Sequence, residues 1–453
     1  MMEVITLETP ALGDRSYVVH DGSVGFVVDP QRDIDRITAI TDELGIAVTH
    51  VLETHVHNDY VSGGLALARR CGASLVHAAG EGLSFDHMAV AAGDVLTVGS
   101  LRVEVVATPG HTPHHLTYVV RDGSAPPAVF TGGSLLHGSV GRTDLIGDEA
   151  TDRLTRAQYR SVRALAGTLP DEARIHPTHG FGSFCTSGGS GDGSDGTLGT
   201  ERRVNSALSV ADEDEFVAQL LDGLGAYPAY YAHMDPLNRA GLGPLDLAPP
   251  TTVDPVELGR RIHRGEWVVD LRPRRAFADH HVAGTIGIEL ADAFVTYVGW
   301  LIPWGMPLTL LADDATDITA AARQLAHIGI DRPAGAATGG PADWAPDANR
   351  RSYPVLRFED LAGTEGQILD VRRNEEHATS HLAGAVNVPI HELTDRIDEL
   401  DGTRHLVHCA SGYRAAIAAS LLDRAGRDVA LIDDDFARAA DAGLPMAGDR
   451  PGH

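Results

Sequence analysis

Apolar runs separated by turn signals predict a mixed α/β order along the N-terminal part of the chain. Two strand-like runs joined by a Gly-containing turn within residues 6–29 indicate a hairpin, and another strand-like run reaches residue 55. Further strands are expected at 74–78, 95–111, 115–121 and 128–133, and helices at 31–45, 65–71 and 157–169. Strands in groups with helices between them favour a layered α/β sandwich over one parallel sheet.

The second half of the chain contains an internal repeat. "WVVDLRPRRAFADHHVAGTIGIEL" at 267–290 resembles "QILDVRRNEEHATSHLAGAVNVPI" at 367–390, and both predict strand, Asp-x-Arg, helix, His, Ala-Gly and strand. Breaks rich in Gly, Pro, Ser or Asp are expected at 185–199, 242–255 and 335–354, the first as a flexible loop. The domains expected from these breaks are residues 1–240, 256–340 and 352–449.

Composition narrows the classes of function. The 453 residues carry 36 basic and 63 acidic side chains, a net charge of −27, and every basic residue except histidine is arginine. Such a surface repels nucleic acid and anionic lipid, so neither is an expected partner. The start of the chain lacks a signal-peptide pattern, and we expect a cytoplasmic protein. Three cysteines, Cys71, Cys185 and Cys409, are too few and too scattered for a disulfide framework and are interpreted as free thiols.

The stretch "CASGYR", residues 409–414, follows a strand and precedes a helix. Backbone N–H groups of such a loop, Ala410, Ser411, Gly412 and Tyr413, form an anion-binding nest, and the helix N-terminus adds positive potential. A thiolate at Cys409 is thereby favoured, and Arg414 is placed to hold a substrate anion over it. The pattern indicates a nucleophile for sulfur or phosphate transfer, against the alternative of a buried inert cysteine.

This loop resembles that of the rhodanese family, together with the upstream Asp370, Arg372, His381 and the Gly-Ala pair at 384–385. The resemblance implies that Cys409 carries a persulfide sulfur. It also implies that 256–340 is a second rhodanese module without a thiol, because Ala312 and Asp313 stand where the loop would open. Packing or dimerisation is the expected role of that module.

Histidines recur on the loops that follow strands in the N-terminal part. "ETHVHNDY" places His55, His57 and Asp59 at alternate positions, while His111 and His179 each follow another strand. His and carboxylate side chains converging from separate strand ends are typical of a metal site, whereas a His pair alone is often an ordinary surface pair. The sequence therefore predicts a metal centre in this unit.

This histidine pattern is similar to that of the metallo-β-lactamase superfold, which implies an αββα sandwich. "GRTDL" at 141–145, "THGFGSFC" at 178–185 and the rhodanese modules resemble the persulfide dioxygenase–rhodanese fusions. Tyr60 stands where dinuclear members carry a second-site histidine, so at most one metal is expected. The resemblance implies one Fe(II) per chain held by His55, His111 and a carboxylate at position 133, with zinc as the alternative.

Position 133 is Gly133, so the carboxylate of the family is absent. Three outcomes stay open. Water or the substrate persulfide fills the vacant position; His57 moves in to give a three-histidine iron or zinc site; or the metal site is degenerate and the unit is structural. Asp59 and His179 are further candidate ligands, while His137 and Asp144 would need a shifted turn to reach the position.

The expected function is oxidation of a low-molecular-weight thiol persulfide by O₂ to sulfite, coupled to sulfane-sulfur transfer at Cys409 with thiosulfate or sulfite as further partners. Two alternatives are a sulfurtransferase or sulfur carrier with a metal-free scaffold, and a zinc-dependent hydrolase. Cys185 is a candidate second sulfur relay or an ordinary loop cysteine, and Cys71 is expected in the core. We expect a homo-oligomer, a dimer or a tetramer.

Overall fold

The structure is a computed structural model that describes residues 1–187, 196–345 and 349–448. Contacts divide the chain into two compact units, residues 1–246 with 323–331 and residues 247–322 with 332–453. Most of the flexible loop expected at 185–199 falls on residues outside the described ranges. Among the described residues, no helix combines the length and the apolar character needed to cross a membrane.

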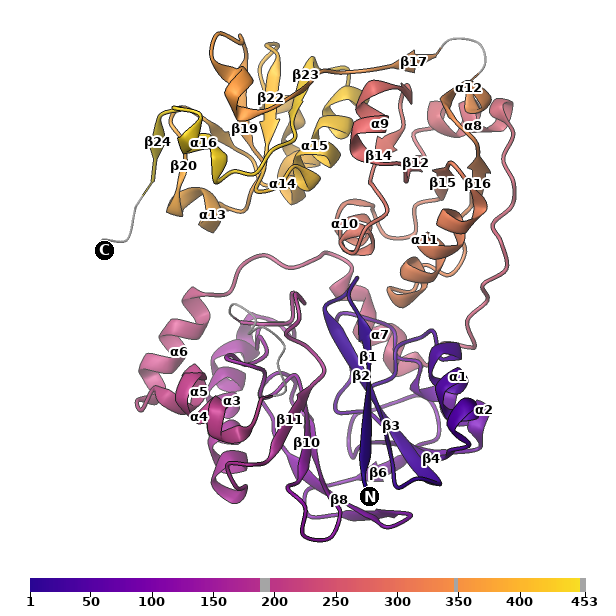
Figure 1. The fold of residues 1–453 in the computed structure, drawn as a ribbon, viewed down its shortest axis with the longest axis vertical. Helices are drawn as coiled ribbons and strands as arrows, with labels where there is room; N and C mark the ends of the chain where they lie inside the picture. The colour runs from indigo at the N-terminus through magenta and orange to yellow at the C-terminus, as the bar shows by residue number, and fades with distance from the viewer. Residues whose placement is uncertain (188–195, 346–348, 449–453) are drawn as a thin grey trace. The chain divides into compact units, whose positions relative to one another are not determined.

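The first unit contains two sheets packed against each other (Figure 1). The six-stranded sheet has the order β1-β2-β3-β4-β5-β6, and the five-stranded sheet has the order β11-β10-β9-β8-β7. Their bounds are β1 Glu3–Thr9, β2 Asp14–His20, β3 Val24–Val28, β4 Ala47–Leu52, β5 Ser74–Ala78, β6 Met88–Val90, β7 Val95–Val98, β8 Leu101–Ala107, β9 Leu116–Arg121, β10 Ala128–Gly132 and β11 Arg174–Pro177. The run expected as one strand at 95–111 is thus a hairpin, because a turn at Gly99 separates β7 from β8.

Alternating apolar residues place helices on both outer faces of these sheets. In β3, Phe26 and Val28 lie in the core between the sheets, whereas Val27 packs toward α1 and α2. In β10, Phe130 faces the same inner core and Val129 packs against α3 and α6. The helices are α1 Asp35–Leu44, α2 Gly64–Cys71, α3 Asp148–Thr168, α4 Leu198–Val204, α5 Ser206–Ser209, α6 Glu213–Asp222 and α7 Tyr231–Ala240. The expected αββα sandwich is confirmed.

The second unit contains two smaller parallel sheets with the same internal order. One is β14-β12-β15-β16. The other, written in the matching direction, is β21-β19-β22-β23, with β18 added at the end beside β23. The first set of elements is α8 Pro255–His263, β12 Trp267–Asp270, α9 Arg274–Asp279, β13 His281–Val282, β14 Ile286–Gly287, α10 Phe294–Leu301, β15 Leu308–Ala312, α11 Ala315–His327, β16 Gly335–Thr338, α12 Pro341–Trp344 and β17 Arg350–Arg351, and residues 323–327 at the end of α11 count with the first unit. The second set is β18 Val355–Leu356, η1 Phe358–Leu361, β19 Gln367–Asp370, α13 Asn374–Thr379, β20 His381–Leu382, β21 Val386–Asn387, α14 Ile390–Arg396, η2 Ile397–Glu399, β22 His405–His408, α15 Tyr413–Arg424, β23 Val429–Ile432, α16 Arg438–Asp441 and β24 Met446–Ala447.

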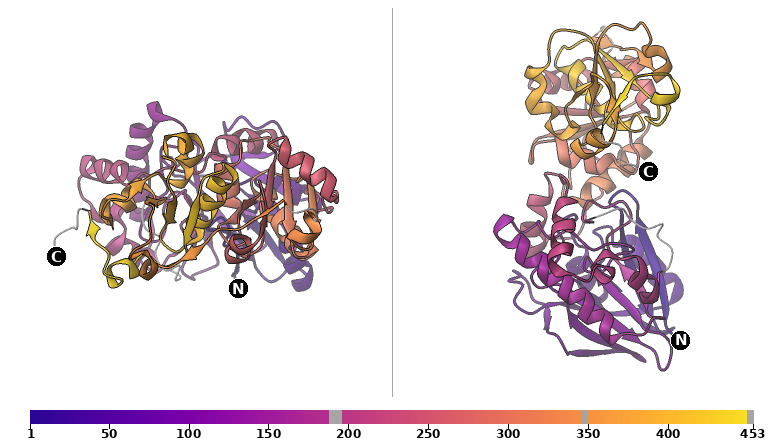
Figure 2. Two further views of the ribbon diagram at one scale, coloured as in Figure 1. Left: turned by 90° about the horizontal axis from the view of Figure 1, so that it is seen from above. Right: turned by 90° about the vertical axis from the view of Figure 1, so that its left-hand side faces the viewer.

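The strand registers relate the two sheets residue by residue. Asp270 of β12 pairs with Leu311 of β15, and Asp370 of β19 pairs with His408 of β22. Figure 2 shows from two further directions that helices lie outside the strands in both units. One expected break, 335–354, was placed too early, because its first residues form the buried strand β16 and the helix α12.

Candidate metal centre and sulfur-transfer loop

Three loops that follow strands bring histidines to one buried place in the first unit. His55 follows β4, His111 follows β8 and His179 follows β11, and each is at most 1% exposed. One ring nitrogen of each lies within 4.8 Å of the others. The Nε2 atoms of His55 and His179 are 3.3 Å apart. The convergence predicted from the strand ends is therefore present for these three residues.

Neighbouring groups fix two of these imidazoles so that Nε2 faces inward. The Nδ1–H of His111 donates to the carbonyl oxygen of Arg142 at 2.7 Å, and its Nε2 is buried with no hydrogen-bond partner among the described residues. The Nδ1 of His55 is 2.8 Å from Thr54 Oγ1, a hydroxyl that itself donates to Asp29. His55 Nδ1 is therefore the donor and its Nε2 carries a lone pair. Inward lone pairs held by outer partners fit a metal ion.

Two carboxylates orient the third histidine. His179 Nδ1 lies 2.8 Å from Asp14 Oδ1 and 3.1 Å from Asp59 Oδ2. Burial lowers the pKa of His179, but Asp59 and Asp14 together raise it well above its ordinary value. For His111, burial and the neighbouring His179 lower the pKa to about 3, so its imidazole is neutral. Asp59 thus contacts the outer nitrogen of His179, on the side away from His55.

His57 is anchored apart from this triad, although with Asp59 and His179 it forms a second group of close ligand atoms. Its Nε2 lies 3.2 Å from Glu53, 3.3 Å from Asp29 and 3.0 Å from the hydroxyl of Tyr60. Burial lowers the pKa of His57, but the two carboxylates raise it to about 9, so the ring is a paired cation. The close grouping of Asp29, Glu53 and His57 is explained by these ion pairs.

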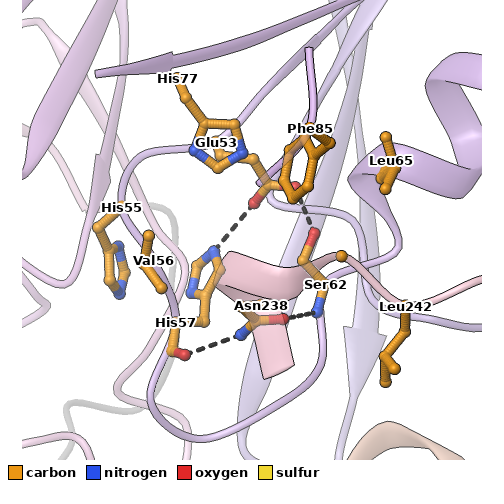
Figure 3. A pocket seen from close by; sticks show the side chains of 11 residues that line it. Glu53, His55, Val56, His57, Ser62, Leu65, His77, Phe85, Asn238 and Leu242 are labelled. Atoms are coloured by element: carbon orange, nitrogen blue, oxygen red, sulfur yellow. Dashed lines mark hydrogen bonds and ion pairs between the residues drawn. The ribbon is translucent and has the colours of Figure 1, made fainter. Parts of the chain in front are cut away.

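A narrow cavity of about 20 Å³ lies beside His55 and His57, enough for about one water molecule. Figure 3 shows Glu53, Ser62 and His77 around it, with Glu53 between His57 and Ser62. Asn238 of α7 donates to the backbone carbonyl of His57 and accepts from the backbone N–H of Ser62. The loop bearing the histidines is thereby tied to a helix distant in sequence.

The loop that carries Cys409 connects β22 to α15 in the second unit. Cys409 is 1% exposed, and its Sγ accepts a hydrogen bond from the backbone N–H of Gly412 at 3.2 Å. Gly412 has φ 89°, and a Cβ there would collide with the carboxylate of Asp433. The tight curl inferred from the sequence therefore requires glycine at this position.

Arg414 and Tyr413 already have partners within the second unit. Two guanidinium nitrogens of Arg414 donate to Glu376 at 2.6 and 2.8 Å. The hydroxyl of Tyr413 donates to the backbone carbonyl of Glu289 at 2.8 Å. Ala410 is half-buried and Ser411 is exposed, so the loop has one open side. Arg414, expected to hold a substrate anion, is paired with the carboxylate of Glu376 in this structure.

Both parts of the chain are similar to known proteins. Residues 357–441 match the family model of the Rhodanese-like domain. Persulfide dioxygenase ETHE1, mitochondrial, of Homo sapiens is 31% identical over 211 residues, which cover 46% of this chain and 74% of that protein. The chain belongs to the ETHE1 family, fused to a rhodanese domain.

The chain is also similar to a hydrolase in sequence and to a metallo-beta-lactamase in structure. A hydroxyacylglutathione hydrolase of Rhodopseudomonas palustris (strain BisA53) is 33% identical over 185 residues, covering 40% of this chain and 68% of that protein. The crystal structure of a metallo-beta-lactamase from Staphylococcus aureus is 27% identical with TM-score 0.66, and the match covers 74% of this chain and 98% of that chain. This match is longer than the ETHE1-family unit, so part of the second unit also has a solved counterpart.

Gly133 lies beside the triad of the ETHE1-family unit, as the resemblance implied. Its N–H donates to Nε2 of His115 at 3.0 Å. A Cβ at this position would lie 2.6 Å from Nε2 and 2.7 Å from Cγ of His111, so the imidazole occupies the space that a side chain would need. The position of the missing carboxylate is therefore filled by a histidine ring, and His179 rather than His57 completes the set of three.

Two residues that shape this centre, His115 and Gln158, were not among the candidates from the sequence. His115 is fully buried and stacks on His55 with ring centroids 4.9 Å apart. Gln158 of α3 accepts from the backbone N–H of His111 at 2.8 Å. The doubled histidine in "TPHHL" was a signal for His115, whereas no local pattern pointed to Gln158, since its partner lies 47 residues away.

The other two cysteines differ in exposure. Cys185 is fully buried, and burial together with Asp59 raises the pKa of its thiol well above the ordinary value. Its Sγ lies 3.8 Å from the hydroxyl of Tyr231. A buried neutral thiol is a poor nucleophile, which speaks against a relay role. Cys71 ends α2 at the edge of a core cluster and is half-buried.

Proposed function

We propose that this protein is an enzyme of sulfur metabolism that oxidises a low-molecular-weight thiol persulfide at the His55–His111–His179 centre and transfers sulfane sulfur at Cys409. The observation that carries the proposal is the inward convergence of three buried imidazoles in an ETHE1-family unit. The rhodanese match around the second centre supports the coupling. We further propose residues 256–340 as a thiol-less module and residues 352–449 as the active one.

The three imidazoles would hold one metal ion, with Fe(II) proposed and zinc as the alternative. Iron bound by protein ligands that leave coordination positions open supplies the means to bring O₂ and a sulfur substrate together. Per turnover, one persulfide, one O₂ and one water would give one thiol, one sulfite and two protons. Oxygen is the oxidant and the terminal sulfur is oxidised, while the inner sulfur leaves as the thiol.

The chain's own residues bury the centre and keep its ligands oriented. The Arg142 carbonyl accepts a hydrogen bond from Nδ1–H of His111. The Thr54 hydroxyl accepts from Nδ1–H of His55 and itself donates to Asp29. Asp14 and Asp59 play the same part for His179. Such outer partners typically change metal affinity or activity by about 10 to 100-fold when removed.

At the second centre, the Cys409 thiolate attacks the sulfane sulfur of a donor. With a thiol persulfide, the donor S–S bond breaks, a Cys409 S–S bond forms, and the donor thiolate leaves. With thiosulfate, the leaving group is sulfite. The Gly412 N–H and the N-terminus of α15 stabilise the negative sulfur at Cys409.

The test uses the full chain loaded with Fe(II), supplied with cysteine persulfide and O₂, while O₂ uptake and sulfite are recorded. His111→Ala should abolish O₂ uptake and leave sulfur transfer to cyanide intact, and Cys409→Ser should give the converse pattern. Iron content by mass spectrometry is expected near one per chain. If the iron-loaded protein transfers sulfur but takes up no O₂, the protein is a sulfurtransferase whose first unit has no oxygenase activity.

That sulfurtransferase is the second candidate, and Gly133 favours it. Without a carboxylate there, an iron would have only neutral imidazole ligands from the triad. A zinc-dependent hydrolase is the third candidate, favoured by the hydroxyacylglutathione hydrolase relative. Against it, Tyr60 bonds His57 and the Asp29 carbonyl, and so offers no imidazole for a second zinc. Zinc content with esterase activity would identify the hydrolase.

A further inference from the structure

The two modules of the second unit allow structural and functional ion pairs to be told apart within one chain. Arg272 and Asp270 form the same pair as Arg372 and Asp370, with Nη2–Oδ2 distances of 2.6 Å in both. In both copies the backbone N–H of the arginine also donates to its aspartate at 3.0 Å. Because the module without a thiol has the same Asp–Arg pair, this pair stabilises the fold of the module and is not specific to the chemistry of the thiol.

A second ion pair exists only in the module with the thiol. Since Leu311 and His408 occupy equivalent positions on their sheets, Ala312 corresponds to Cys409 and Asp317 to Arg414. When the two Asp-x-Arg motifs are aligned, Ala276 is the residue equivalent to Glu376. The Arg414–Glu376 pair therefore accompanies Cys409 and has no counterpart in the copy without a thiol.

In this pair, the carboxylate of Glu376 offsets the positive charge of Arg414 that an anionic substrate would otherwise contact. Both terminal nitrogens of Arg414 donate to the two oxygens of Glu376. Burial raises the pKa of Glu376, but the hydrogen bonds and charge of Arg414 lower it to about 2, so the carboxylate is ionised at neutral pH. The Arg414 side chain is 14% exposed and that of Glu376 is 25% exposed, so the pair is only partly screened by water.

The second carboxylate beneath the loop is also matched by arginine. Asp433, which would contact a Cβ at Gly412, accepts from Arg274 at 2.8 Å and from Arg275 at 2.5 Å. Arg373 also reaches Glu376 at 3.2 Å, but it is 44% exposed and its charge is well screened. Arg275 is 58% exposed, so water screens its charge as well, whereas the less exposed Arg414 and Arg274 are offset by Glu376 and Asp433 and leave little net field near the thiol for a dianion.

We propose that Glu376 is a positioning residue that neutralises Arg414 and makes the Cys409 centre select persulfide donors over dianionic thiosulfate. This inference rests on the proposed sulfur transfer at Cys409. A persulfide brings one negative charge or none to the loop, and the Gly412 N–H with the α15 N-terminus suffices for it. Thiosulfate carries two negative charges and would need the guanidinium of Arg414, which is already hydrogen-bonded to Glu376.

The experiment compares kcat/KM for thiosulfate and for cysteine persulfide in the full chain, with cyanide as acceptor. In Glu376→Gln the ratio of thiosulfate to persulfide should rise by about tenfold or more, chiefly through a lower KM for thiosulfate. Glutamine keeps the capping contact to the backbone N–H of Arg373, so the variant should fold. Glu375→Gln, an exposed neighbour on the same helix, removes the same charge and should leave the ratio unchanged.

Two measurements separate charge from structure. Glu376→Asp keeps the negative charge and should return the ratio to near its wild-type value. In the wild-type protein, sulfate should not compete with the persulfide beyond the effect of chloride at equal ionic strength, a result that needs no variant. An unchanged or lower ratio in Glu376→Gln, or competition by sulfate in the wild type, would overturn the inference. Absence of any Cys409-dependent transfer with either donor would instead overturn the proposed function.

Discussion

The space around Gly133 gives a sharp test of the metal centre. Replacing Gly133 by alanine puts a Cβ 2.6 Å from His111 Nε2 and 2.7 Å from its Cγ, where ordinary contacts begin near 3.4 Å. The ring is fully buried and held by the Arg142 carbonyl, so it has to move by several tenths of an ångström or more. Overpacking of this kind costs about 1 to 3 kcal/mol. Loss of the buried hydrogen bond to Arg142 adds about 1 kcal/mol.

The expected destabilisation by Gly133→Ala is therefore about 2 to 4 kcal/mol. For a unit of this size, it lowers Tm by about 4 to 16 °C. Scanning calorimetry measures the shift, and mass spectrometry of iron-loaded protein should show a clear fall in iron per chain because His111 is displaced.

Gly167→Ala is the matched control. Gly167 is an exposed residue of α3 with open space around it, and alanine there should stabilise the helix by up to about 1 kcal/mol. Gly133→Asp requires the same displacement as Gly133→Ala and should be equally destabilised. Wild-type Tm and iron content in Gly133→Ala, or higher iron content in Gly133→Asp, would refute the packing argument.

Three further predictions concern the other residues of the two centres. Asp14→Asn removes the charge beside His179 and should lower iron affinity by about 10 to 100-fold in a chelator competition, and unchanged affinity would contradict the ligand role of His179. Cys409→Ser should abolish persulfide formation on the protein, detected by mass spectrometry after exposure to cysteine persulfide, and a persulfide retained on Cys185 would contradict its assignment as an inert thiol. Burial lowers the pKa of His408 to about 4, so His408 binds a proton more readily in the unfolded chain than in the folded one. The free energy of unfolding therefore decreases as pH falls from about 6.5 toward 4. His408→Leu should remove up to about 3 kcal/mol of that loss, seen as a shallower fall of Tm with pH, and an unchanged pH profile would refute the burial of a neutral ring.

The sequence alone determined the layered fold, the duplication and the loops that carry the chemistry. Alternating apolar residues predicted which strands pack on two faces, and β3 behaves in this way, with Phe26 and Val27 in different layers. The histidines after β4, β8 and β11 were correctly placed at strand ends, since the ends of neighbouring strands meet at one edge. These properties depend on residues near one another in the chain, and a single sequence displays them.

Only the tertiary structure decided which side chains meet. His179 approaches His55 across 124 positions of sequence, while His57 is drawn to Asp29 and Glu53 on the other side. Arg414, expected to be available for an anion, meets Glu376 from 38 positions away. Such choices depend on distances between loops and on competition among buried charges, because each buried ion has to be paired where it lies. Local pattern fixes neither of these, and the pairing of the site emerges only in the folded chain.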